Sequence, residues 1–233
     1  MENVKNDMWT LTFLELMDKS FGIVGTLERD IYDSEIKQNI GIYDNFDICK
    51  TRLFTGDEAL YHVYIVQRSK DGHLKATKSV AHFHVKNGTE LEFLKPGIIS
   101  LCELYNARAY INLNGKLQKP ITINILTNIT EGLKSNNFQC HNLFYSSMDQ
   151  VLPRNKVWVL DCDDTSINKL ENIIKVVNGR KTGSTNGAVI TALPTPNGFH
   201  LLTHPFDKSE FQIPNVEVKT NSPTLLYYKK IKP

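Results

Sequence analysis

The sequence lacks the features that mark several classes of protein. None of its apolar runs approaches the roughly 20 residues that a membrane-spanning helix needs, and its first residues lack the basic start and apolar core of a signal peptide. A net charge of +2 is too small to indicate a polyanion partner by itself. Cysteine is scarce and never spaced as CxxC, which predicts free thiols in a reducing cytoplasm and no zinc knuckle.

What is present is the composition of a globular protein that can bury a core. Hydrophobic residues make up 41% of the chain and charged residues 22%, and both values are ordinary for a folded domain. Alternation and turn signals predict strands in the first half, and helical spacing predicts helices between them. The strands are expected at 60–67, 80–85 and 107–114, and the helices at 8–19, 96–106 and 120–134.

The last third of the chain has the clearest pattern of secondary structure, and it completes an α/β (α+β) fold class. A soft boundary near 94–97 divides the chain into an N-terminal helix and β-meander module, 1–95, and a core over 96–233. In the last third a strand is expected at 156–161, a helix at 166–177, and further strands at 188–193, 199–203, 216–219 and 224–228.

Two aspartates close the strand predicted at 156–161. The apolar run 157–160 leads into Asp161 and Asp163, and residues two apart in a strand point to the same face. Neighbouring carboxylates repel unless one is protonated or a cation lies between them. Hard divalent cations such as Mg²⁺ prefer carboxylate oxygens and keep room for substrate phosphates. The pair indicates either a metal platform for phosphate chemistry or a solvated loop after a buried strand.

Two further motifs follow this pair along the chain. The turn 195–198, of sequence TPNG, leads into a strand that carries His200, and the strand 216–219, of sequence VEVK, offers Glu217 and Lys219 on one face. Nucleotidyl transfer needs such parts, because carboxylates hold metals and a cation or donor holds the triphosphate. A glycine lets backbone and phosphate approach closely.

In this order, the motifs hhhDxD, TxxGxH and hEhK resemble those of the archaeo-eukaryotic primase superfamily, the primase-polymerases. The resemblance covers roughly residues 156–228. It implies that three acids bind Mg²⁺ or Mn²⁺ and that a histidine contacts the nucleotide phosphates. The implied catalytic residues are Asp161, Asp163, Glu217 and His200, the three acids among them being the metal ligands, and the implied nucleotide contacts are His200, Lys219, Gly198, Thr195 and Asn197.

The resemblance also implies a fold, a reaction and partners. The family's catalytic core is an RRM-like antiparallel palm joined to an N-terminal α/β module. Its reaction is metal-dependent nucleotidyl transfer, which makes RNA or DNA from nucleoside triphosphates on a single-stranded DNA template. A replicative helicase is a candidate partner, and no membrane is expected. Small stand-alone relatives tend to come from phages and plasmids, so we expect a minimal catalytic core of that type in a host cytoplasm.

Two other interpretations stay open. The segment 161–165, DCDDT, also resembles the DxDxT motif of haloacid-dehalogenase-type phosphatases, with Asp161 as nucleophile and Asp163 as general acid and base. That motif normally opens its domain, and no two later acids in this chain are adjacent. The other interpretation is a catalytically degenerate primase fold that only binds nucleotide or single-stranded nucleic acid. The chain departs from the primase pattern where PNG precedes Phe199, since serine and glycine are frequent there in the family.

Several other residues have both a structural and a functional interpretation. His82 and His84 lie two apart on one predicted strand, which indicates a solvated face rather than a metal pair. Arg68 and Lys70 end a predicted strand and are candidates for the wall of a nucleic-acid groove. Arg108 is either a buried ion-pair partner or a nucleotide contact, and the sequence does not choose between these roles.

Overall fold

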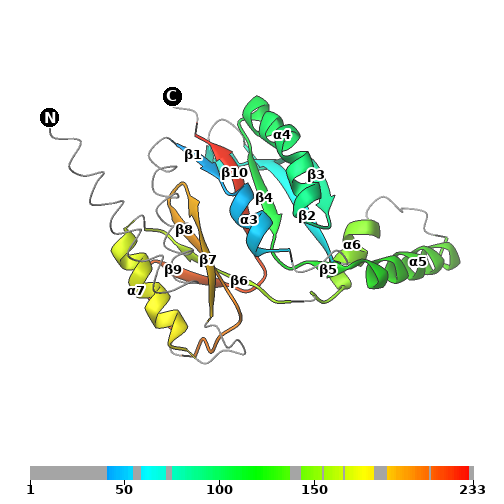
Figure 1. Ribbon diagram of the computed structural model, residues 1–233. Helices are drawn as coiled ribbons and strands as arrows, with labels where there is room; N and C mark the ends of the chain where they lie inside the picture. Colours follow the sequence, from blue (N-terminus) through cyan, green and yellow to red (C-terminus); the bar gives the residue numbers. More distant parts are fainter. Residues whose placement is uncertain are drawn as a thin grey trace.

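The computed structural model describes residues 41–54, 59–71, 75–136, 143–153, 155–164, 166–180, 188–209 and 211–230. The helix predicted at 8–19 lies outside these residues. Within them the protein is a mixed α+β structure with two antiparallel sheets (Figure 1), which confirms the predicted fold class. None of the described helices combines the length and apolar character needed to cross a bilayer.

The larger sheet contains strands from both the beginning and the end of the described chain. Its strand order is β1-β10-β4-β2-β3, with β5 beside β2, and every pairing is antiparallel. Burial alternates along β2, because one face of the sheet packs on the core and the other is half exposed. Its strands are β1 (Ile42–Asp44), β2 (Ala59–Gln67), β3 (Lys78–Val85), β4 (Arg108–Asn112), β5 (Lys116–Leu117) and β10 (Pro223–Lys229).

Helices α3 (Phe46–Arg52) and α4 (Gly88–Tyr105) share one hydrophobic core with the buried face of this sheet. The structure begins α4 eight residues before the helix predicted at 96–106, because the Asn87 side chain accepts a hydrogen bond from the Glu90 N–H and caps the helix there. Helices α5 (Gln118–Lys134) and α6 (Leu143–Gln150) contact each other and extend away from both sheets (Figure 1).

The smaller sheet contains the strands of the three sequence motifs. Its order is β7-β8-β6-β9, all antiparallel, so the first strand in the chain lies between the third and the fourth. Helix α7 (Ile167–Asn178) connects β6 to β7 and buries its apolar stripe on one face of the sheet. The strands are β6 (Trp158–Cys162), β7 (Val189–Thr195), β8 (Gly198–Thr203) and β9 (Val216–Lys219).

Buried asparagines connect the two sheets. The Asn45 side chain is fully buried, and its Nδ2 donates to the carbonyl oxygens of Pro194 in β7 at 3.2 Å and of Leu225 in β10 at 2.9 Å. The Asn114 Oδ1 accepts a hydrogen bond from the Val157 N–H at 2.8 Å. Because a buried polar group is costly to leave without its partner, these contacts fix the orientation of one sheet on the other.

The two sheets do not follow the division expected between residues 95 and 96. That position lies inside α4, and β10, from the end of the described chain, pairs with both β1 and β4 of the larger sheet. Apolar side chains from the larger sheet, Val63 and Ile65, share one core with Val159 and Leu202 from the smaller sheet. Both sheets therefore contribute to a common core.

Candidate active site

The three sequence motifs meet in one row across the smaller sheet. Asp161 of β6 lies directly opposite His200 of β8 on one side and Glu217 of β9 on the other. On β6, Leu160 and Cys162 belong to the core under α7, so the alternation of a strand turns Asp161 to the opposite face. Residues far apart in the chain come together there because β6 lies between β8 and β9.

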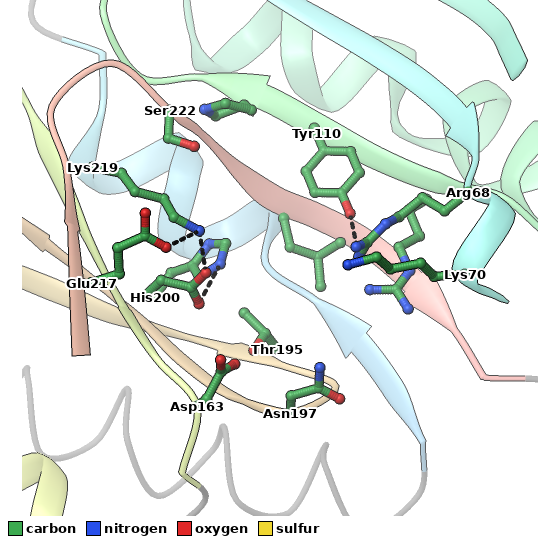
Figure 2. A pocket seen from close by; sticks show the side chains of 14 residues that line it. Arg68, Lys70, Tyr110, Asp163, Thr195, Asn197, His200, Glu217, Lys219 and Ser222 are labelled. Carbon is green, nitrogen blue, oxygen red and sulfur yellow. Dashed lines mark hydrogen bonds and ion pairs between the residues drawn. The ribbon is translucent and has the colours of Figure 1, made fainter. Parts of the chain in front are cut away.

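The carboxylate of Asp161 is held from two sides. Its Oδ1 lies 3.4 Å from His200 Nε2, and its Oδ2 lies 2.5 Å from the Lys219 ammonium. The same Lys219 Nζ lies 3.2 Å from Glu217 Oε2, so two of the predicted metal ligands share one lysine (Figure 2). Glu217 is the more accessible acid, because its side chain is 73% exposed and that of Asp161 only 22%.

These contacts set the charge of the site. The hydrogen bond from His200, followed by that from Lys219, holds the pKa of Asp161 well below its usual range, although partial burial acts in the opposite direction. Partial burial also lowers the pKa of Lys219, but Asp161 and Glu217 more than offset this effect and raise it overall. Asp161 is therefore ionised and Lys219 is charged at neutral pH.

Asp163 lies apart from this ion-paired group. It follows the end of β6 and is exposed. Figure 2 shows its carboxylate pointing into the same cavity, near Thr195 and Asn197. Asp161 and Asp163 thus line one space, as their spacing predicts, but they do not share a cation. Among the described residues, no three His, Cys, Asp or Glu side chains are grouped so that they could hold a metal ion.

The motif residues form one wall of a cavity of about 400 Å³ between the two sheets. The facing wall comes from the larger sheet and from the short 3-10 helix η1 (Ser69–Asp71) that follows β2. It contains the cationic side chains of Arg68, Lys70 and Arg108 together with the ring of Tyr110. Figure 2 shows Arg68 and Lys70 extending into the space across from the acidic wall. Acids on one wall therefore face cations on the other.

The three cations of this wall differ in their partners. The Arg108 guanidinium is buried and forms a bidentate ion pair with Asp71, with N–O distances of 2.6 and 2.5 Å. Arg68 Nη1 donates to the Tyr110 hydroxyl at 3.4 Å, and neither Arg68 nor Lys70 forms an ion pair with another described residue. Arg108 thus has the buried ion pair that was one of its two expected roles, and it also lines the cavity. Arg68 and Lys70 carry the positive charge that is not already paired with an acid of the described residues.

Gly198, which the sequence analysis assigned to nucleotide binding, has a structural role in the sheet. It is not one of the residues that line the cavity. A Cβ at this position would overlap the carbonyl oxygen of Cys162 and the backbone of Asp164. Only glycine therefore lets β8 pass this close to the end of β6. Thr195 and Asn197, from the same turn, do line the cavity.

Thr224 is a site residue that no sequence motif marks. It is fully buried in β10, and its Oγ1 lies 2.9 Å from His200 Nδ1. Because β10 belongs to the larger sheet, this hydrogen bond crosses from one sheet to the other. With Nε2 near Asp161 and Nδ1 on Thr224, both ring nitrogens of His200 are engaged and the orientation of the ring is fixed.

The predicted histidine pair lies outside the cavity, on the half-exposed face of the larger sheet. His82 and His84 of β3 flank His62 of β2, a third histidine that the sequence analysis did not connect with them. The His62 and His82 ring nitrogens lie 2.9 Å apart, and the ring centroids of His62 and His84 lie 5.0 Å apart. Burial, followed by the neighbouring imidazoles, lowers the pKa of His62 to about 4. This face is therefore only partly solvated.

Comparisons of the chain with protein-family models, with curated proteins and with solved structures found no match. The function must therefore be inferred from the residues and their geometry.

Proposed function

We propose that this protein is a metal-dependent nucleotidyltransferase of the primase-polymerase type, which makes RNA or DNA on a single-stranded template. The proposal rests on one observation: Asp161, His200 and Glu217 form a row across three adjacent strands, facing a cavity that Arg68 and Lys70 line from the other side. Phosphoryl transfer needs acids for metals and cations for phosphates, and here both kinds of residue line the same cavity.

A nucleoside triphosphate suits the chemistry of this cavity. A volume of about 400 Å³ lies within the usual range for small-molecule sites. Arg68 and Lys70 supply positive charge for the polyphosphate. Thr195 and Asn197 supply a hydroxyl and an amide, and Tyr110 supplies an aromatic surface. The cavity therefore offers partners for each part of a nucleotide.

Asp161 and Glu217 fit the role of metal ligands because they already converge on one positive charge. Their oxygens lie 2.5 and 3.2 Å from Lys219 Nζ. These two acids, with Asp163 from the edge of the cavity, would hold Mg²⁺ or Mn²⁺. When bound there, such an ion would supply the positive charge that orients an attacking hydroxyl and stabilises a leaving pyrophosphate. The protein's own contribution is to keep Asp161 ionised and fixed in place through His200.

The role of His200 as a phosphate contact is supported by its place in the lining of the cavity, on the wall that carries the acids. Because its ring nitrogens face Asp161 and Thr224, a phosphate would have to replace the longer of these contacts, the 3.4 Å one to Asp161. The succession β6, α7, β7, β8 and β9, with β6 between β8 and β9, supports the RRM-like palm of the resemblance. A replicative helicase as partner and a phage or plasmid setting follow from the resemblance alone.

Template extension tests the proposal directly. A labelled primer on a single-stranded template, and the template alone, would be incubated with ribo- or deoxynucleotides and Mn²⁺, with wild type and Asp161→Ala/Asp163→Ala compared. We expect template-dependent products from the wild type and none from the folded variant, and the nucleotide that is used identifies the product. The absence of products from a folded wild type would contradict the proposal.

One observation favours a second candidate, a degenerate primase fold that binds without catalysis. The position between Asp161 and Glu217 is taken by Lys219, and no metal-binding group of three is present in the described part of the chain. Such a protein would bind nucleotides or single strands and give no products. The phosphatase alternative has less support, because it needs Asp161 as a nucleophile and both its oxygens contact basic side chains.

A further inference from the structure

Lys219 lies where the proposed function requires a metal ion. Its Nζ is 2.5 Å from Asp161 Oδ2 and 3.2 Å from Glu217 Oε2, and its side chain is only 32% exposed. The same residue lines the cavity. The ammonium therefore interacts with two carboxylates that otherwise would face each other on adjacent strands, where like charges destabilise a sheet.

The lysine can leave this position without crossing the protein. Its side chain has a flexible four-carbon stem and ends in a compact charge with three donors. Since it already borders the cavity, a rotation of the stem would turn the ammonium from the carboxylates towards the space that Arg68 and Lys70 line from the other side. A polyphosphate in that space would offer the ammonium new acceptors.

We propose that Lys219 is a tethered counter-ion, which neutralises Asp161 and Glu217 until a divalent cation replaces it and then binds the phosphates of the nucleotide. This inference rests on the proposed function, and it specifies how the site is loaded. Without nucleotide, the lysine competes with the metal for the two carboxylates. Once nucleotide is bound, the lysine binds the phosphates and no longer opposes the metal. Metal and nucleotide should therefore strengthen each other's binding. The nucleotide offers acceptors to the lysine that the metal displaces, and the metal neutralises the carboxylates that the lysine leaves.

The first test is Mn²⁺ binding to the full chain without nucleotide, measured from the electron paramagnetic resonance signal of free Mn²⁺. Lys219→Met removes the charge and keeps the length of the side chain. We expect this variant to bind Mn²⁺ roughly tenfold more tightly than the wild type, because the competing cation is gone. Lys219→Arg keeps the charge and should bind no more tightly than the wild type. Equal or weaker Mn²⁺ binding by Lys219→Met would overturn the inference.

A matched control is an ion pair between α7 and the loop that follows β6. Lys169 Nζ is 2.5 Å from Asp164 Oδ2, an ion pair of the same kind that does not line the cavity. Lys169→Met should leave the Mn²⁺ affinity unchanged. If Lys169→Met raises the affinity as much as Lys219→Met does, the effect is one of overall charge and the inference fails.

The second test is the coupling between metal and nucleotide. A non-hydrolysable triphosphate should raise the Mn²⁺ affinity of the wild type more than that of Lys219→Met, and an equal increase would contradict the role in phosphate binding.

Circular dichroism checks folding, and Lys219→Gln replaces Lys219→Met if the latter does not fold. These binding measurements do not depend on nucleic-acid synthesis. If the wild type extends a template but Lys219→Met binds Mn²⁺ no more tightly than the wild type, this inference alone is overturned. A failure of extension with tighter Mn²⁺ binding in Lys219→Met overturns only the proposed function.

Discussion

The two sheets differ in what they give to the cavity that they share. The smaller sheet and the loops at its strand ends contribute the acids Asp161, Asp163 and Glu217, whereas the larger sheet and η1 contribute the cations Arg68 and Lys70. The acids lie in recognisable motifs and the cations do not. The comparison teaches that the sequence motifs mark one wall of the cavity, while the cations of the facing wall lie outside any motif, on or beside the other sheet.

The sheets also differ in how they hold their side chains. The smaller sheet presents His200, but the larger sheet fixes its orientation through Thr224. The connection is reinforced by Asn45, which donates to the backbone of both sheets. The larger sheet therefore acts as a support for the smaller one as well as the opposite wall of the cavity.

The largest expected effect comes from removing the central acid of the smaller sheet. Asp161→Ala should lower the rate of nucleotide incorporation by at least about 100-fold, the order of loss seen when a catalytic electrostatic group is removed. It should also lower the free energy of unfolding by about 1–3 kcal/mol, because Lys219 and His200 lose a partly buried partner. Single-nucleotide incorporation and urea unfolding measure the two effects.

Asp164→Asn is the control for this variant, since Asp164 is ion-paired with Lys169 outside the cavity and an amide oxygen can still accept from the Ser166 N–H. It should keep nearly full activity. A comparable loss of incorporation in Asp164→Asn would show that the acidic loop as a whole matters, and not the row across the sheet.

The next effect comes from the cationic wall. Arg68→Ala and Lys70→Ala should each weaken nucleotide binding by roughly tenfold, because a charge-assisted hydrogen bond to phosphate is lost, and added salt should reduce the difference. A fluorescent nucleotide titrated at two ionic strengths measures this. Lys175→Ala, on the exposed side of α7, is the control. If Arg68→Ala and Lys70→Ala both keep the nucleotide affinity of the wild type, the cationic wall does not bind the nucleotide.

A smaller effect is expected from the contact between the sheets. Thr224→Val keeps the shape of the side chain and removes the hydrogen bond to His200 Nδ1. We expect incorporation to fall roughly fivefold, about the value of one neutral hydrogen bond. Thr224→Ser keeps the hydroxyl and should restore incorporation. If Thr224→Val has the activity of the wild type, the larger sheet does not position His200.

The smallest effect concerns a face of the larger sheet that is outside the cavity. The pKa of His62 is about 4 in the folded protein against an ordinary value of 6.5, so between these values the unfolded chain binds more protons. The free energy of unfolding should therefore fall as the pH drops from 6.5 to 4. Solvent screening at this half-exposed face limits the loss to about 1 kcal/mol.

Urea unfolding at pH 7 and pH 4.5, with His62→Gln beside the wild type, measures this contribution. The variant should lose less stability than the wild type between the two pH values, while its nucleotide affinity at pH 7 stays unchanged. A pH dependence that is identical in the two proteins would rule out His62 as its source.

Several elements follow directly from local sequence signals. The strand predicted at 60–67 is β2, Ala59–Gln67, and the helix predicted at 166–177 is α7, Ile167–Asn178. Alternation in the first and one apolar stripe in the second identify them, because each pattern reflects burial on one face. The start of α4 was predicted too late, because its cap is a single asparagine, Asn87, and the internal Pro96 resembles a helix start.

Contacts between distant parts of the chain could not be predicted in this way. No local signal shows that β10 pairs with β1 and β4, which brings Thr224 to His200. Likewise, the ion pair of Arg108 depends on Asp71, which lies on a different element. Such contacts depend on which strands become neighbours, and that depends on the burial of whole surfaces.

The sequence by itself determined which residues are candidates for the chemistry and the strand faces on which they lie. The period of a strand fixes that Glu217 and Lys219 share one face and that Asp161 points away from Cys162, because backbone geometry alone sets this alternation. Only the tertiary structure decided that β6 lies between β8 and β9, so that the motifs align in one row, and that the cationic wall faces them. The physical reason is that strand order and sheet packing follow from burying apolar surface across the entire chain.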